Sequence, residues 1–489
     1  MEREKKERKT CVRYNMGKNN IEKYVKEEHI KEDRKRKYMS EKNIRQEHLF
    51  TNKMLRALVI PLILEQLLNS LMGTVDTMMV SNVGSVAISA VSLVDSINVL
   101  VIQAFAAMAA GGAIVCAQYF GRRDIEKTKE TAKQLLFITG MISLVITGLC
   151  LIFCSPLLKF IFGEVEAAVM EASKTYFFYT ALSFPFIAIY GAGASIFRAQ
   201  ENTKGPMTIS VISNILNICG NAILIFSLDM GVAGAAISTL ISRAFCAVVV
   251  LWQLRLERQP VVIRDYWKIK PEWKTIKAIL SLGIPSGIEN SMFQLGKLAI
   301  QSTVSTLGTV AIAAQAMTNS LEYISGVAPI GVGIGMMTVV GECIGAGRKD
   351  EAEYYIKKLT KWAEVVLVVA CLSVFALTKP ITILGGMERE SAELCFKMVC
   401  WITLVKPVAW LFSFMPAYGM RAAGDVRFSM ITSCCTMWFC RYLVSVVLIR
   451  FFGFGPMGVW IGMFADWAAR SIVFGWRFKS RRWMKHSVV

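Results

Sequence analysis

Residues 61–90, PLILEQLLNSLMGTVDTMMVSNVGSVAISA, recur in altered form 224 residues later as residues 285–314, PSGIENSMFQLGKLAIQSTVSTLGTVAIAA. The displacement aligns the first proline of each stretch, places Glu65 on Glu289, and matches GSVAISA to GTVAIAA. Matches over so long a stretch are not expected from shared apolar composition alone. The chain is therefore predicted to contain two homologous halves.

Long apolar runs cover most of the chain, and 54% of its 489 residues are hydrophobic. A helix needs about 20 apolar residues to cross the hydrocarbon core of a bilayer. The predicted spans are residues 54–81, 86–116, 134–155, 170–197, 207–227, 231–254, 278–304, 310–340, 358–379, 394–420, 428–450 and 458–478. This predicts an all-α polytopic membrane protein of twelve transmembrane helices. Six spans return the chain to its starting side, so the two six-helix lobes form a parallel repeat about a pseudo-two-fold axis along the membrane normal.

Basic residues are distributed unevenly between the two sets of connections. The connections after alternate spans, together with the C-terminal tail, hold 26 Lys and Arg residues, whereas the other set holds six. Positively charged connections remain in the cytoplasm. Both termini are therefore predicted to be cytoplasmic, in a multi-pass protein of a bacterial inner or plasma membrane.

The same reading divides the chain into five parts. They are a charged, disordered N-terminus (1–50), a first lobe (51–256), a basic cytoplasmic linker (257–277), a second lobe (278–480) and a cytoplasmic tail (481–489). The N-terminal part is too polar to form a core. Met39 or Met54 is an alternative start to Met1.

The formal charge of +19 does not indicate a nucleic-acid partner. Most basic residues flank apolar runs, and no basic motif is interleaved with aromatic residues. The three histidines lie outside the apolar body, and no cysteine pair has the spacing of a metal or redox site. No HExxH, paired-aspartate or Walker A motif is present. We therefore expect neither an enzyme nor a cofactor nor a structural metal.

A polar stripe runs along the first predicted span. Glu65, Asn69 and Asp76 fall at about 0°, 40° and 20° around a helix with 100° per residue. This stripe is predicted to face the interior of the lobe rather than lipid. A carboxylate inside a span indicates function, although hydrogen bonds alone can also satisfy a buried aspartate.

Four segments of the sequence resemble the MATE family, the multidrug and toxic compound extrusion transporters. They are GTVDTMMVSNVGSVAISAVSL (73–93), AQYFGRRD (117–124), LGIPSGIENSMFQLGK (282–297) and VAIAAQAM (310–317). The resemblance covers residues 51–480. It implies twelve helices in two lobes, export of organic cations and other amphipathic drugs, inward flow of Na⁺ or H⁺, and rocker-switch alternating access.

The resemblance places the cation-binding acid of the family at Asp76. On the fifth predicted span, Asn214, Asn217 and Asn221 lie on one helical face. Their amides either ligate Na⁺ or hydrogen-bond Asp76, or they only connect helices. The family often has Asp at the position of Asn221, so one acid fewer is present, which favours H⁺ over Na⁺. Thr239 matches a cation-site hydroxyl of the family.

The second half offers Glu289 and Lys297 on its first span, eight residues apart. These two residues, with Glu65 and Asn69 of the first half, are the predicted candidates for the substrate cavity or its gate. Because Glu65 and Glu289 are repeat equivalents, we expect a shared role, either at the cavity floor or gate, or in an ion pair with a nearby Lys or Arg. The position equivalent to Asp76 is Ile300, which predicts a coupling site confined to the first lobe.

The sequence thus predicts a monomeric secondary antiporter that exports organic cations or amphipathic drugs across the lipid bilayer in exchange for H⁺ or Na⁺, with Na⁺ binding at Asp76 in the second case. The alternative in the same superfamily is a flippase or exporter of a lipid-linked saccharide or another amphipathic metabolite. Substrate identity does not follow from the sequence.

Overall fold

The computed structural model describes residues 48–489, except residues 164, 258, 267–268, 487 and 489. Residues 52–489 form one compact unit, and every regular element in its described part is a helix. The N-terminal part that the sequence predicts to be disordered lies, up to residue 47, outside the described residues, as does the alternative start Met39.

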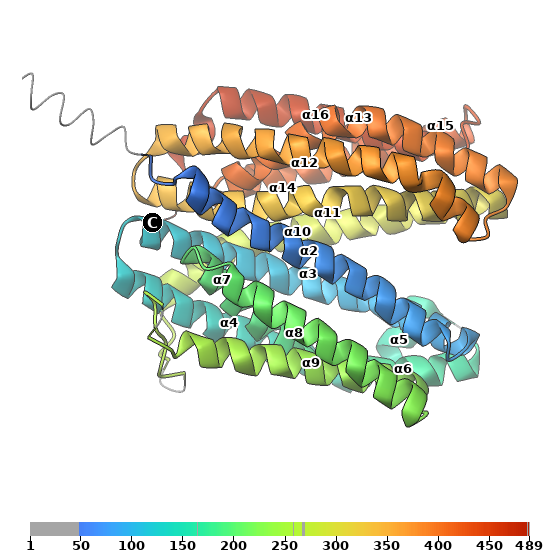
Figure 1. Cartoon of the computed structure of the whole chain (residues 1–489), viewed down its shortest axis with the longest axis horizontal. Coiled ribbons are helices and arrows are strands. Elements are labelled where there is room, and N and C mark those ends of the chain that lie inside the picture. Colours follow the sequence, from blue (N-terminus) through green and yellow to red (C-terminus); the bar gives the residue numbers. More distant parts are fainter. Residues whose placement is uncertain (1–47, 164, 258, 267–268, 487, 489) are drawn as a thin grey trace, which may run out of the picture. The chain divides into compact units, whose positions relative to one another are not determined.

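The first lobe consists of the helices before the basic linker. They are α2 (Asn52–Ser81), α3 (Ser85–Gly121), α4 (Ile125–Ile152), α5 (Cys154–Phe162), α6 (Ala167–Leu182), α7 (Phe184–Ala199), α8 (Lys204–Asn221), the π-helix η1 (Ala222–Ser227) and α9 (Gly231–Leu254). Figure 1 shows these helices, coloured blue to green, gathered together.

The second lobe consists of the helices after the linker. They are α10 (Trp273–Val304), the short 3₁₀-helix η2 (Ser305–Leu307), α11 (Thr309–Gly345), α12 (Lys349–Leu384), α13 (Arg389–Ala422), α14 (Val426–Cys435), the π-helix η3 (Thr436–Leu443), α15 (Val444–Arg450), α16 (Met457–Lys479) and the 3₁₀-helix η4 (Arg482–Lys485). In Figure 1, α11 to α16 lie beside the first lobe.

Ten segments of the described chain are long and apolar enough to cross a membrane, with α6 and α7 together forming one of them. The remaining two predicted spans are α10 and α16, whose hydropathy is lowered by polar and charged residues. Both nevertheless pack among the spans, α10 along α3 and α16 along α13. With these two, the fold has the twelve spans in two lobes that the sequence predicts.

The largest boundary errors occur at repeat-equivalent places. Helices α4 and α12 begin at Ile125 and Lys349, nine residues before the predicted starts of their spans. Their first turns carry acidic residues, which favour a helix N-terminus, and the backbone amide of Lys127 is capped by the Asp124 side chain at 3.1 Å. These turns are charged helical extensions of the spans, which hydropathy alone does not detect.

The structure differs from the predicted spans in two further places, one in a less basic connection and one inside a span. Helix α5 lies mostly in the connection between the predicted spans 134–155 and 170–197. The predicted span 170–197 is divided at Ser183 into α6 and α7, and Pro185 lies in the first turn of the second helix, where its missing N–H is tolerated.

The two lobes touch most closely where α3 and α11 end. A Cβ atom on Gly121 would lie 2.2 Å from the backbone oxygen of Glu342, and one on Gly345 would lie 2.0 Å from that of Gln118. These contacts are repeat equivalents of one another. Only glycine permits so close an approach of two backbones, so the lobes are in direct contact at the end that carries the basic connections.

Candidate cation-coupling and substrate sites

Asp76 lies near the C-terminal end of α2, where it faces Asn217 and Asn221 of α8. The Asn221 side-chain amide donates to Asp76 Oδ1 at 2.8 Å. The Asn217 amide satisfies both its polar atoms when its nitrogen faces Asp76, at 2.7 Å from Oδ1 and 3.3 Å from Oδ2. Both asparagines are buried. The structure thus brings together three of the predicted coupling residues in one hydrogen-bonded group.

Thr239 and Asn214 differ in their relation to this group. The Thr239 hydroxyl of α9 lies 3.4 Å from the Asn217 amide, on the side away from Asp76. Asn214 is half-buried, and the described structure gives it no hydrogen bond to Asp76. Of the three predicted asparagines, Asn217 and Asn221 reach the carboxylate.

A second polar group, around Asp95 of α3, extends the site within the first lobe. Asp95 Oδ1 accepts from Asn98 at 3.1 Å and from the Tyr176 hydroxyl at 3.4 Å. Arg243 of α9 donates to Ser183 Oγ at 2.7 Å and attracts both Asp76 and Asp95 electrostatically. The sequence prediction did not include Arg243 in the site, although an arginine inside a predicted span was a usable signal.

A cleft of about 610 Å³ lies between the lobes at the end opposite their close contact. Its first wall is the C-terminal half of α2, including Asn69 and Thr77, and its second wall is α11, including Tyr323 and Ile324. Asn69 Oδ1 accepts a hydrogen bond from Ser210 of α8 at 2.9 Å. The cleft has the volume typical of a drug-sized site, and Asp76 lies on the helix that lines it.

Glu65 and Glu289 form buried ion pairs inside their own lobes. Glu65 pairs with Arg198 at the end of α7 at 2.7 Å, and Glu289 pairs with Arg421 at the end of α13 at 2.5 Å. The sequence left two interpretations open for these glutamates, a cavity or gate position and an ion pair. The structure shows the ion pair in both lobes. Neither glutamate lines the cleft between the lobes.

Lys297 lies apart from Glu289 and belongs to a group of cations around Phe293. Its ammonium is 5.3 Å from the centre of the Phe293 ring, and the guanidinium groups of Arg441 and Arg470 lie 5.2 and 5.3 Å from the same centre. Arg470 is also paired with Asp466 at 2.8 Å. Cations are attracted to the face of an aromatic ring, so Phe293 helps to hold three positive charges in the second lobe.

The second lobe therefore differs chemically from the first. Ile300, the equivalent of Asp76, is buried in an apolar cluster with Val304 and Met437. Glu322 of α11 is held in an ion pair with Lys406 of α13 at 2.6 Å. The group that would receive a coupling cation in the first lobe has no equivalent at this place in the second.

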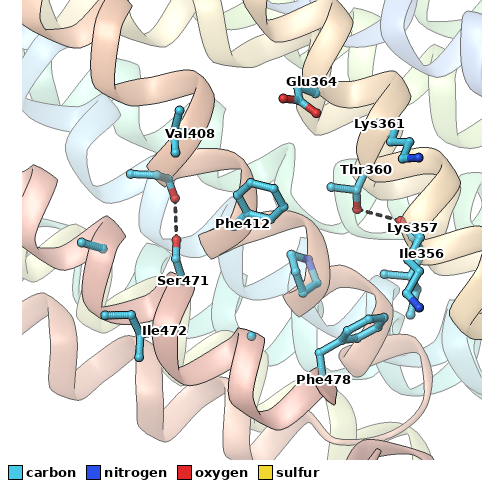
Figure 2. Close-up of a pocket in the computed structure, with 14 residues that line it drawn as sticks. Ile356, Lys357, Thr360, Lys361, Glu364, Val408, Phe412, Ser471, Ile472 and Phe478 are labelled. Carbon is cyan, nitrogen blue, oxygen red and sulfur yellow. Dashed lines mark hydrogen bonds between the residues drawn. The ribbon is translucent and has the colours of Figure 1, made fainter. Parts of the chain in front are cut away.

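A separate pocket of about 710 Å³ lies within the second lobe, between α12, α13 and α16 (Figure 2). Its lining includes Lys361, Phe412 and Ile472. None of the residues predicted for coupling or substrate binding lines it.

A family model matches the chain twice, over residues 61–223 and 285–447, and describes the family MatE. The chain belongs to the MatE family, the MATE transporters. The two matches begin 224 residues apart, which confirms the internal repeat. As a MATE transporter the chain is a membrane protein, and the expected family resemblance is confirmed over both halves.

Curated relatives span almost the same length as this MATE transporter. The chain is 26% identical over 444 residues to a protein of Thermotoga maritima named probable multidrug resistance protein NorM, with 89% of this chain and 94% of the relative covered. It is 25% identical over 433 residues to the uncharacterized transporter YisQ of Bacillus subtilis, with 87% and 93% covered.

Solved structures share the fold. A crystal structure of MATE in complex with MaD3S superposes with a TM-score of 0.82 at 21% identity, covering 88% of this chain and 96% of the other. A structure described as the outward-facing conformation of a multidrug resistance MATE family transporter has the same TM-score at 20% identity, covering 88% and 95%. At this identity, the likeness establishes the fold alone.

Proposed function

We propose that this MATE transporter is a multidrug exporter, a secondary antiporter that exchanges organic cations or amphipathic drugs for an inwardly moving cation by rocker-switch alternating access. The observation that carries the proposal is the single carboxylate of Asp76, held by two amides in the lobe wall beside the cleft between the lobes. The names of the curated relatives support a drug substrate.

The arrangement around Asp76 favours H⁺ as the coupling ion. Asn221 presents its N–H₂ group to the carboxylate, as does Asn217 in the orientation that satisfies its polar atoms. Na⁺ binds through oxygen atoms, so its entry at this point requires both amides to rotate. A proton binds to the carboxylate alone, and its uptake neutralises a charge that costs free energy inside the membrane.

The cleft supports the substrate side of the proposal. Its walls combine apolar groups such as Met78 and Ile324 with the hydroxyls of Thr74 and Tyr323, which suits amphipathic molecules. With the basic connections in the cytoplasm, the closed end of the lobe interface faces the cytoplasm and the cleft opens outward. Both chain ends then lie on the cytoplasmic side.

The direct test is efflux of a cationic dye from proteoliposomes under a pH gradient or a Na⁺ gradient imposed separately. Efflux under the pH gradient alone is expected from the wild-type chain, and Asp76→Asn should abolish it while leaving a monodisperse protein. Asp229→Asn is the matched control, because Asp229 is an exposed loop residue with a φ of 51°, which asparagine tolerates. Undiminished efflux by the Asp76 variant would refute the coupling role, and dependence on Na⁺ alone would refute the choice of H⁺.

A further inference from the structure

The pocket between α12, α13 and α16 is a groove whose walls are mainly apolar and whose two hydroxyl groups are already hydrogen-bonded within the protein. In Figure 2, α12 supplies Lys357, Thr360, Lys361 and Glu364 along one side, opposite Val408, Phe412, Ser471 and Ile472. The Thr360 hydroxyl donates to the Ile356 carbonyl at 2.7 Å, and the Ser471 hydroxyl donates to the Ala409 carbonyl at 2.8 Å. The groove therefore offers an occupant mainly apolar contact.

The apolar side chains of the groove are strongly exposed in the protein alone. Val408 is 66% exposed and Ile472 is 72% exposed. A groove of about 710 Å³ bounded by such side chains does not remain empty in a bilayer, since acyl chains fill exposed apolar surface at this depth.

The charges on α12 indicate the depth of the groove. Lys361 and Lys379 are eighteen residues apart, about 27 Å along a helix, which is close to the roughly 30 Å thickness of the hydrocarbon core. Glu364 is the one charged residue between them. Lys361 therefore lies at the level of the lipid headgroups on the side of the basic connections, and the groove extends from there into the leaflet.

Lys361 is available to a ligand. Lys357, one turn away, is held by Glu353 at 2.6 Å, whereas no acidic side chain of the described residues forms an ion pair with Lys361. Glu364 lies one turn deeper than Lys361, so a phosphate beside Lys361 stays above it. An exposed, unpaired ammonium above an apolar groove matches a phosphate group attached to acyl chains.

We propose that this groove binds one anionic phospholipid of the leaflet on the basic side, with its phosphate at Lys361 and an acyl chain between Phe412 and Ile472. The proposal is independent of drug export and of the coupling ion. It concerns the outer face of the second lobe, away from the cleft between the lobes.

The steric test uses two glycines whose surroundings are alike. Gly475 lines the groove, and a Cβ atom there meets nothing within 4 Å; Gly148 of α4 has equally open surroundings but lies in the first lobe. Gly475→Leu should fill the groove without a clash, and Gly148→Leu is the control. Native mass spectrometry of protein released from nanodiscs of phosphatidylglycerol and phosphatidylethanolamine should show one retained phospholipid fewer for Gly475→Leu alone. Equal retention by both variants, each with an unchanged unfolding temperature, would overturn the proposal.

The charge test addresses the headgroup. Lys361→Gln should reduce the preference for phosphatidylglycerol over phosphatidylethanolamine about fivefold, as expected for one lysine near an anionic surface. Lys277→Gln, at an exposed lysine of α10, should leave this preference unchanged. An unaltered preference in the Lys361 variant would contradict the proposal. A photo-cross-linking residue in place of Ile472 should form lipid adducts, and adducts to residues 1–47 of the chain instead would show a different occupant.

Discussion

Asn214 and Asn221 lie two turns apart on α8, but only Asn221 donates to Asp76. A hydrogen bond to a charged group contributes about 1.5–3 kcal/mol, which corresponds to roughly a tenfold to hundredfold change in an equilibrium constant. Asn221→Ala should therefore lower gradient-driven dye efflux at least about tenfold, because the ionised carboxylate loses a donor. Asn214→Ala should transport nearly as well as the wild type. Equal losses in the two variants would mean that the asparagine face acts through packing.

The buried ion pair of Glu65 and Arg198 leads to a prediction about protein stability rather than about transport. Breaking a buried ion pair by removing one partner costs about 3–5 kcal/mol, and Glu65 is only 2% exposed. Glu65→Ala should lower the unfolding temperature in detergent. Removing Arg198 as well should recover part of the loss, since no unpaired charge then remains. A double variant with the sum of the two single losses would show that the pair is not coupled.

At the scale of helices, α8 packs on α9 and holds Asn217 and Asn221 beside Asp76. A Cβ atom on Gly234 of α9 would lie 2.9 Å from the backbone of Leu224 in the π-helix η1, directly after Asn221. Gly234→Ala should therefore push η1 away, lowering stability by about 1–3 kcal/mol and reducing efflux. Gly148→Ala, with open space around it, should instead be neutral or gain up to about 1 kcal/mol from helix propensity. Differential thermal unfolding of the two variants measures the contrast.

The sequence predicts all twelve spans, because a helix that crosses the hydrocarbon core needs an apolar run of a set length. The helical period also places Asn217 and Asn221 on one face of their span, whereas the resemblance to the MATE family, not residue spacing, connects that face with Asp76. The ion pairs of Glu65 and Glu289 remained one of two alternatives, since their arginines lie more than 130 residues away. Those pairings depend on how helices pack, which the spacing of residues along one helix does not encode.

The sequence does not predict the groove between α12, α13 and α16, nor the π-helices, and the reason is related. A groove arises where two helices diverge, and a π-helix arises where backbone hydrogen bonds shift by one residue. Neither changes the pattern of apolar residues. Arg243 shows the opposite case, because its charge was visible in an apolar span, but its two carboxylate neighbours come from other helices.

At the scale of the two lobes, the crossing of α3 and α11 determines whether the basic end can remain closed. A side chain at Gly121 cannot fit 2.2 Å from the Glu342 carbonyl. Gly121→Leu should therefore separate the lobes at that end and shift the protein away from the arrangement in which the basic end is closed. Distances between spin labels on α3 and α11 should lengthen at the closed end in nanodiscs. Unchanged distances would show that the contact does not hold the lobes together.

The same closed end carries a pH-sensitive contact. Glu201, in the turn between α7 and α8, hydrogen-bonds Glu342 of α11, and burial raises the pKa of Glu201 above its ordinary value of 4.5 despite that hydrogen bond. A raised pKa means that the folded contact favours the protonated acid. Its stabilisation of the closed end is therefore complete below about pH 4.5 and is lost as the pH rises through the raised pKa.

Raising the pH on the basic side should consequently favour separation of the lobes at that end, because Glu201 then ionises at a buried contact with Glu342 that favours the protonated acid. Glu201→Gln keeps a hydrogen-bonding side chain without the charge, so it should hold the closed end over the whole pH range. The spin-label distances across α3 and α11, followed from pH 4 to pH 8, measure this directly. If the Glu201 variant opens with the same pH dependence as the wild-type chain, another group controls the closed end. The rocker-switch proposal would then need a different link between proton concentration and lobe position.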